Sequence, residues 1–200
     1  MNKAYLQQIR EIQGQTGPNM CLASSKFLAL KLLGFVDPTK KLNDFLHSRW
    51  ALRHKHLPLK SYWGGSMTEF NAAFNKTALL AAVNDPSAGV KAAGIGQIRF
   101  ATGFTTLHGT KMADTMLHQG TPLVVGVSIH GGSGRDHFIL IFRDPGARIW
   151  AVDPWPGDLE NAVVELGRDM TFTKKFKIHL TADATNTEIP CGVPFFGYFK

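Results

Sequence analysis

The segment Asp144-Pro145-Gly146 places the strongest constraint on the fold, because it separates two runs rich in branched and aromatic residues. Proline presets one turn angle and glycine accepts a positive φ, so the segment predicts the turn of a β-hairpin. If Asp144 and Ala147 flank the turn, opposite residues have numbers that sum to about 290 or 291. Residues opposite each other on one face have Cβ atoms about 4.5 to 5.5 Å apart. This register predicts that His137 faces Asp153.

The same register pairs apolar side chains further along the hairpin. It places Ile141 opposite Ile149 and Ile139 opposite Ala151. Because the side-chain period of a strand is two, a slip of one residue separates the paired side chains onto opposite faces.

The elements change in kind along the chain. Helical patterns cover 4–13, 21–33, 40–53, 67–83 and 109–119, and strand patterns cover 123–129, 137–144, 148–153 and 170–180. We expect the strands to be consecutive and antiparallel. Helices followed by strands indicate a segregated α+β fold. We find no repeat or linker, so we expect a single domain over residues 1–200.

The helix predicted over 21–33 begins with a cysteine and is apolar nearly all round. Asn19 is a suitable cap and Gly34 a suitable stop for it. We therefore expect a buried helix with Cys21 in its first turn, where the positive end of the helix dipole favours a thiolate.

Composition limits the classes of function. The chain has 22 Lys and Arg against 15 Asp and Glu, a formal charge of +7 that favours acidic partners. No nucleic-acid signature accompanies the basic residues, so we expect a solvated basic face rather than nucleic-acid binding. No apolar run approaches the roughly 20 residues of a membrane span, and the polar N-terminus argues against a signal peptide. Two cysteines suit a reducing compartment and do not suggest a disulfide framework.

Three residues together suit nucleophilic catalysis. A carboxylate on one imidazole nitrogen fixes the tautomer and leaves the other nitrogen for a nucleophile. Asp153 and His137 would form this pair, and Cys21 is the candidate nucleophile. Each residue alone has a structural interpretation, as a packed cysteine, a hydrogen-bonded histidine or a turn-forming aspartate. Their combination favours the catalytic interpretation.

These motifs resemble the papain-like cysteine peptidase superfamily. The resemblance consists of Gln15 six residues before Cys21, the segment Gly134-Arg135-Asp136-His137-Phe138, and Val152-Asp153-Pro154 at the end of the next strand. The Cys-to-His separation of 116 residues, the His-to-Asp separation of 16 and the segment DPWPG are most similar to the YopT/AvrPphB-type bacterial effector proteases and papain-fold toxin domains.

The resemblance implies a papain-like α+β fold, with the central helix carrying Cys21 packed against an antiparallel sheet. It implies Cys21 as nucleophile, His137 as general base and acid, Asp153 as orienting residue and Gln15 as oxyanion donor, with Gln13 as the runner-up for the last role. The implied partners are a protein substrate and an immunity or chaperone protein. The implied setting is the cytoplasm of a producing bacterium, with export into a target cell by a route that needs no signal peptide.

Three other functions share or bypass this triad. A glutamine or asparagine deamidase uses the same chemistry on a side chain. A peptidoglycan amidase is a further alternative, although such relatives more often place a second histidine where Asp153 stands. The third alternative belongs to another class of function: a basic binding module, in which the three residues of the triad come together by coincidence.

Other residues give weaker signals. His54 and His56 are two potential metal ligands without a third, so we expect a solvated loop, no metal and no cofactor. Cys191 has no comparable His-Asp hairpin, so we expect it to be structural. Trp155 is expected to cover the triad, to line the cleft or to pack in the core.

Overall fold

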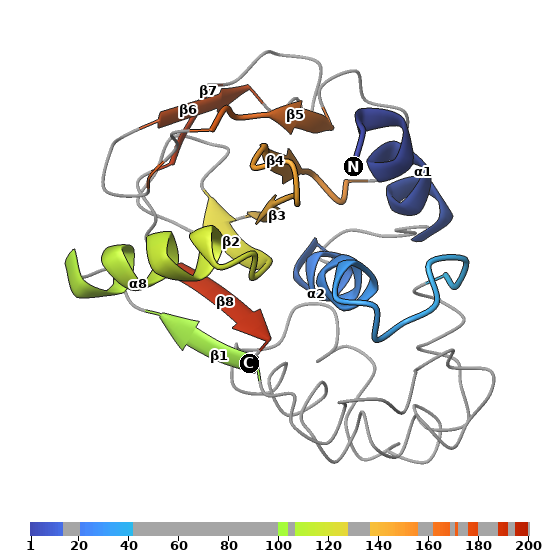
Figure 1. The fold of residues 1–200 in the computed structure, drawn as a ribbon, viewed down its shortest axis with the longest axis horizontal. Coiled ribbons are helices and arrows are strands. Elements are labelled where there is room, and N and C mark those ends of the chain that lie inside the picture. The colour runs from blue at the N-terminus through green and yellow to red at the C-terminus, as the bar shows by residue number, and fades with distance from the viewer. Residues whose placement is uncertain are drawn as a thin grey trace.

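The structure, a computed structural model, describes residues 1–13, 21–41, 100–103, 107–127, 137–155, 162–168, 171, 176–179, 188–191 and 195–199. These residues form the helices α1 (Lys3–Gln13), α2 (Cys21–Leu32) and α8 (Leu107–His118). The strands are β1 (Phe100–Gly103), β2 (Leu123–Val127), β3 (His137–Arg143), β4 (Ile149–Val152), β5 (Val163–Glu165), β6 (Phe176–His179), β7 (Glu188–Cys191) and β8 (Phe195–Phe199) (Figure 1). The helix predicted over 67–83 lies outside the described residues, as do residues 42–53 of the helix predicted over 40–53, whose first two residues are described and are not helical.

Six strands form one antiparallel sheet in the order β1-β8-β2-β3-β4-β5, and β6 and β7 form a separate pair. Helices together with an antiparallel sheet confirm the predicted α+β class. The prediction that the strand in 170–180 continues the series was wrong, because β5 follows β4 and β6 pairs with β7. The strand β8 comes from the end of the chain and pairs with β2.

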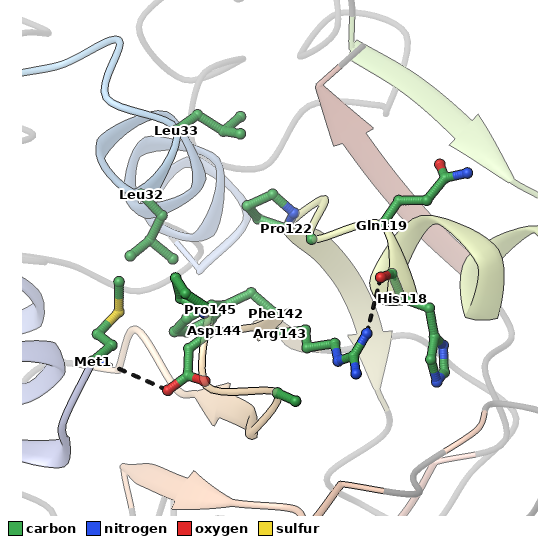
Figure 2. A pocket seen from close by; sticks show the side chains of 12 residues that line it. Met1, Leu32, Leu33, His118, Gln119, Pro122, Phe142, Arg143, Asp144 and Pro145 are labelled. Carbon is green, nitrogen blue, oxygen red and sulfur yellow. Dashed lines mark hydrogen bonds and ion pairs between the residues drawn. The ribbon is translucent and has the colours of Figure 1, made fainter.

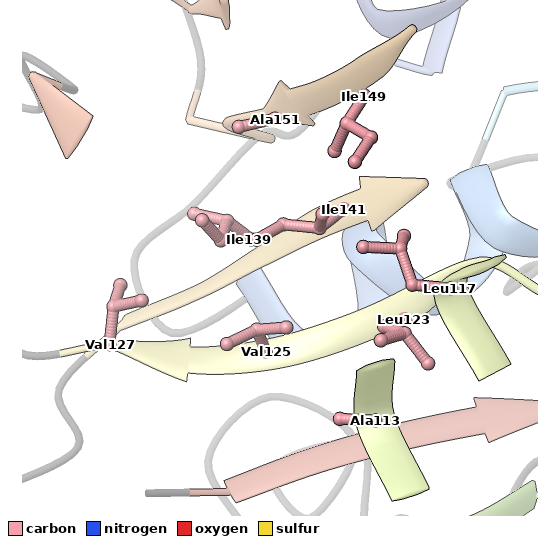
Figure 3. Packing of buried hydrophobic residues seen from close by; sticks show 9 residues of the cluster. All are labelled: Ala113, Leu117, Leu123, Val125, Val127, Ile139, Ile141, Ile149 and Ala151. Carbon is pink, nitrogen blue, oxygen red and sulfur yellow. The ribbon is translucent and has the colours of Figure 1, made fainter. Parts of the chain in front are cut away.

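Both faces of the sheet are covered. One face carries a cluster of buried side chains, to which α8 contributes Ala113 and Leu117; the strands contribute Leu123, Val125, Val127, Ile139, Ile141, Ile149 and Ala151. Figure 3 shows these side chains between α8 and the strands, with α2 behind β3. Because successive strand residues point to opposite faces, Val124, Leu140 and Val152 point away from the cluster, and they too are buried. Burial on both sides explains the uniformly apolar sequence of β2.

The helix α2 is buried as predicted. Phe27, Leu28 and Leu30 are at most 1 % exposed. The helix ends at Leu32, and Gly34 follows with a φ of 77°. The N–H of Gly34 donates to Lys31 O and the N–H of Phe35 donates to Leu30 O. These two bonds form a Schellman motif, in which glycine takes the left-handed conformation at no steric cost. No described helix has the length and apolar character needed to cross a membrane.

The hairpin between β3 and β4 exists, but its register differs from the predicted one. Ile141 pairs with Ala151 and Arg143 with Ile149, so opposite residues have numbers that sum to 292 (141 + 151). The difference arises in the turn: Asp144 pairs with Arg148, and Ala147 adopts a φ of 64°. A three-residue loop that ends in a left-handed residue is a common hairpin connection. The predicted pairing of His137 directly with Asp153 was therefore wrong by two residues.

Candidate functional site

His137 and Asp153 are hydrogen bonded despite the altered register. His137 is the first residue of β3, Asp153 follows the last residue of β4, and His137 Nε2 lies 2.8 Å from Asp153 Oδ1. A shift of two residues leaves both side chains on the same side of the hairpin, and a diagonal neighbour is still within reach of a long side chain. Both side chains are 1 % exposed. The carboxylate therefore meets the imidazole in a site that excludes water.

The third residue of the predicted triad reaches this site because α2 runs alongside β3 in the same direction. Near the start of both elements, Ser25 Oγ donates to Phe138 O at 3.1 Å. At their other ends, Leu32 and Phe142 line the same cavity. This alignment places Cys21, the first residue of α2, at the His137 end of the sheet. Cys21 is partly exposed and is a free thiol.

The pKa of His137 shows the combined effect of its surroundings. Burial alone lowers it, but the hydrogen bond to Asp153, interaction with the Cys21 thiol and the charges of both groups raise the pKa from 6.5 to about 10. Among the described residues, His137 Nδ1 has no partner at hydrogen-bond geometry. The interaction between the Cys21 sulfur and the imidazole is thus looser than the hydrogen bond between the imidazole and the carboxylate. The ring nitrogen that Asp153 leaves available is the one that can serve Cys21.

This raised pKa predicts a pH dependence of stability. Between pH 6.5 and about 10 the folded protein holds a proton on His137 that the unfolded chain has lost. The contribution of His137 is therefore fully present below pH 6.5 and is lost as the pH rises to about 10. We expect the free energy of unfolding to fall more steeply over this interval in the natural protein than in His137→Gln, as measured by urea denaturation at a series of pH values. Parallel pH profiles would contradict the raised pKa.

Trp155 and Arg10 complete the surroundings of the pair. The main-chain N–H of Trp155 donates to Asp153 Oδ1 at 2.9 Å, and the indole ring contacts the His137 ring at a centroid distance of 5.7 Å and an interplanar angle of 68°. Trp155 therefore contacts the imidazole edge-on. Arg10 in α1 donates to the main chain on either side of Pro154. Sequence analysis did not identify Arg10, since a polar residue in an amphipathic helix gives no signal of such a contact.

Several predicted residues cannot be placed in this site. Gln15, His54 and His56 lie outside the described residues, and the side chain of Gln13 is not described. The main chain of Cys191 lies in β7, which is paired with β6 outside the six-stranded sheet. Within the described part of the chain, no cluster of three His, Cys, Asp or Glu side chains could hold a metal ion. The roles of Gln15 and Gln13 remain predictions.

A cavity of about 450 Å³ lies away from this site (Figure 2). It is formed at the C-terminal ends of α2 and α8 and at the β3–β4 turn, with Leu33, His118 and Pro145 among its lining residues. Since a 12-residue helix is about 18 Å long, this cavity and Cys21 are at opposite ends of α2. The cavity therefore contributes nothing to the candidate triad.

Comparison of the chain with models of known protein families, with curated proteins and with solved structures finds no match.

Proposed function

We propose that this chain is a papain-like cysteine hydrolase that cleaves peptide bonds, with Cys21, His137 and Asp153 as its catalytic triad. The supporting observation is that one buried imidazole is bonded to Asp153 at 2.8 Å and also interacts with the Cys21 thiol. Acyl transfer uses this spatial order of groups: a nucleophile, a base beside it, and a third group that orients the base.

The proposed reaction begins with the attack of the Cys21 thiolate on a carbonyl carbon. The first N–H groups of a helix have no acceptor within the helix, so the N–H of Cys21 at the start of α2 is available to the oxyanion, together with the side-chain amide of Gln15. His137 Nδ1 donates its proton to the leaving amine as the C–N bond breaks. Water then attacks the thioester, His137 accepts a proton from it, and the C–S bond breaks to restore the thiolate.

The surroundings of the triad support this assignment. Asp153 and Trp155 hold the imidazole by a hydrogen bond to Nε2 and a ring contact, which leaves Nδ1 as the nitrogen available to Cys21. Exclusion of water strengthens the electrostatic interaction of the imidazolium with the carboxylate. The partial exposure of Cys21 beside two fully buried partners leaves the sulfur as the member of the triad that a substrate can reach.

The setting proposed for this activity follows from the resemblance to effector proteases and toxin domains described above. We propose an exported bacterial protein that acts on a protein target in another cell. An immunity or chaperone protein that blocks the site in the producing cell is part of this proposal.

Intact-mass spectrometry separates a protease from a deamidase. We expect proteins from a target-cell extract to yield new fragments after incubation with the natural protein, with new termini at the cut sites. A deamidase instead increases the mass of an intact substrate by about 1 Da, because the same acyl transfer then acts on a side-chain amide. A mass increase without fragments would contradict the protease assignment and retain the triad. If neither fragments nor a mass increase were found while Cys21 was intact, both the protease and the deamidase assignments would be contradicted.

A further inference from the structure

Arg10 connects the N-terminal helix to the segment that carries Asp153. It lies in the last turn of α1 and is 5 % exposed. Its Nε donates to Asp153 O at 2.6 Å, and its Nη2 donates to Trp155 O at 2.6 Å. One guanidinium thus holds two carbonyl groups on either side of Pro154.

The segment held by Arg10 lies beyond the regular sheet. The strand β4 ends at Val152, and its pairing with β5 ends there too. After that point the Asp153 N–H donates to Ala162 O at 2.8 Å, while Pro154 has no N–H to contribute. The two donors of Arg10 therefore bind carbonyl groups that the strand ladder does not reach. Their planar, fixed geometry determines both carbonyl positions at once.

Fixing this main chain fixes the carboxylate. Asp153 Oδ1 accepts from the Trp155 N–H, two residues along, and is bonded to His137 Nε2. Movement of the carbonyl groups of residues 153 and 155 would therefore move the carboxylate relative to the imidazole. Charge-assisted hydrogen bonds from a buried guanidinium are the strong kind of contact needed to prevent this movement.

The rest of α1 is suited to hold Arg10 in place. Leu6 and Ile9 are buried with it, whereas Lys3 and Glu11 are exposed. The helix packs against α2 and against β5, so it contacts the helix of the nucleophile and the strand next to β4. The backbone of α1 is consequently tied to both sides of the site.

We propose that Arg10 is a positioning residue, which makes α1 part of the catalytic site by holding the Asp153 carboxylate within hydrogen-bond distance of His137. This inference rests on the proposed function of the triad. Arg10 acts through Asp153 and not on the substrate.

The test compares Arg10→Gln and Arg10→Lys with Arg143→Gln. Arg143 is a matched control because its Nη1 also donates to a main-chain carbonyl, that of His118, at 3.0 Å and at the far end of β3. Two quantities are measured in each folded variant: the rate at which iodoacetamide alkylates Cys21, and the pKa of His137 by NMR titration. Neither measurement requires a known substrate.

We expect Arg10→Gln to slow alkylation of Cys21 at pH 7 by on the order of 10- to 100-fold, the usual loss when a supporting contact is removed. The pKa of His137 should fall from about 10 towards 6.5. Arg10→Lys should retain part of the alkylation rate and part of the raised His137 pKa. An ammonium group can bind one of the two carbonyl groups well but lacks the paired donors of the guanidinium. Arg143→Gln should behave as the natural protein.

Unchanged alkylation and an unchanged His137 pKa in Arg10→Gln would overturn the inference, as would equal losses in Arg143→Gln. If Arg10→Gln does not fold, Arg10→Lys decides, and natural values of both quantities in that variant would overturn it. Failure of the proposed function would give a different result, which is seen in the natural protein. In that case Cys21 of the natural protein is alkylated no faster than an ordinary thiol, before any change at Arg10.

Discussion

Replacement of Cys21 by alanine is expected to reduce the proposed peptide hydrolysis by on the order of 10⁴- to 10⁶-fold, to the background rate. The reason is that Cys21 is the only member of the proposed triad that forms a bond to the substrate. Cys21→Ser should also be inactive, because an imidazole matched to a thiol activates a hydroxyl poorly. The measurement is fragment formation from a target-cell extract at equal protein concentrations.

Cys191→Ala is the matched control for this loss. Cys191 is the other cysteine of the chain, and its strand β7 is outside the sheet that carries His137. We expect this variant to retain the natural activity. Full activity in Cys21→Ala, or a comparable loss in Cys191→Ala, would rule out Cys21 as the nucleophile.

The second large effect is expected for Asp153→Ala, which should lose both activity and stability. Asp153 is fully buried, and its removal leaves His137 Nε2 and the Trp155 N–H without their acceptor. Breaking a buried charged pair by removal of one partner costs about 3 to 5 kcal/mol. Asp153→Asn keeps an acceptor of similar shape, so we expect a smaller loss of stability. The measurements are urea denaturation and NMR titration of His137.

Asp144→Ala provides the comparison. Asp144 is also a buried aspartate that follows a strand, and it accepts hydrogen bonds from Arg148 and Trp150 at the turn end of the hairpin. This variant should lose stability but keep the raised pKa of His137. If both variants lowered the His137 pKa equally, or if neither did, Asp153 would not be the group that holds the imidazolium.

The local parts of the site could be predicted from sequence because short-range chemistry determines them. The apolar pattern and Gly34 determine α2, and the Asp144-Pro145-Gly146 turn determines the hairpin. The predicted register of the hairpin differed from the observed one by two residues, because nothing in the sequence indicates that Ala147 adopts a positive φ. His137 and Asp153 are nevertheless close together, because a shift of two residues leaves both side chains on the same face of the hairpin.

The long-range parts could not be predicted in the same way. Pairing of β8 with β2 joins segments about 70 residues apart, and no local pattern encodes such a contact. Arg10 and Ser25 bind main-chain carbonyl groups. Because every residue has such a group, the sequence does not indicate which residues they bind. Helices α1 and α2 were correctly predicted, but their contacts with β3 and β5 required the structure.

The most direct test of the proposed triad is the rate of iodoacetamide alkylation at Cys21 and at Cys191 in the natural protein and in His137→Ala, followed by peptide mass spectrometry near neutral pH. The triad predicts that Cys21 is alkylated much faster than Cys191, and that this difference disappears in His137→Ala because the imidazolium no longer stabilises the thiolate. Equal, slow alkylation of both cysteines in the natural protein would contradict the proposed function.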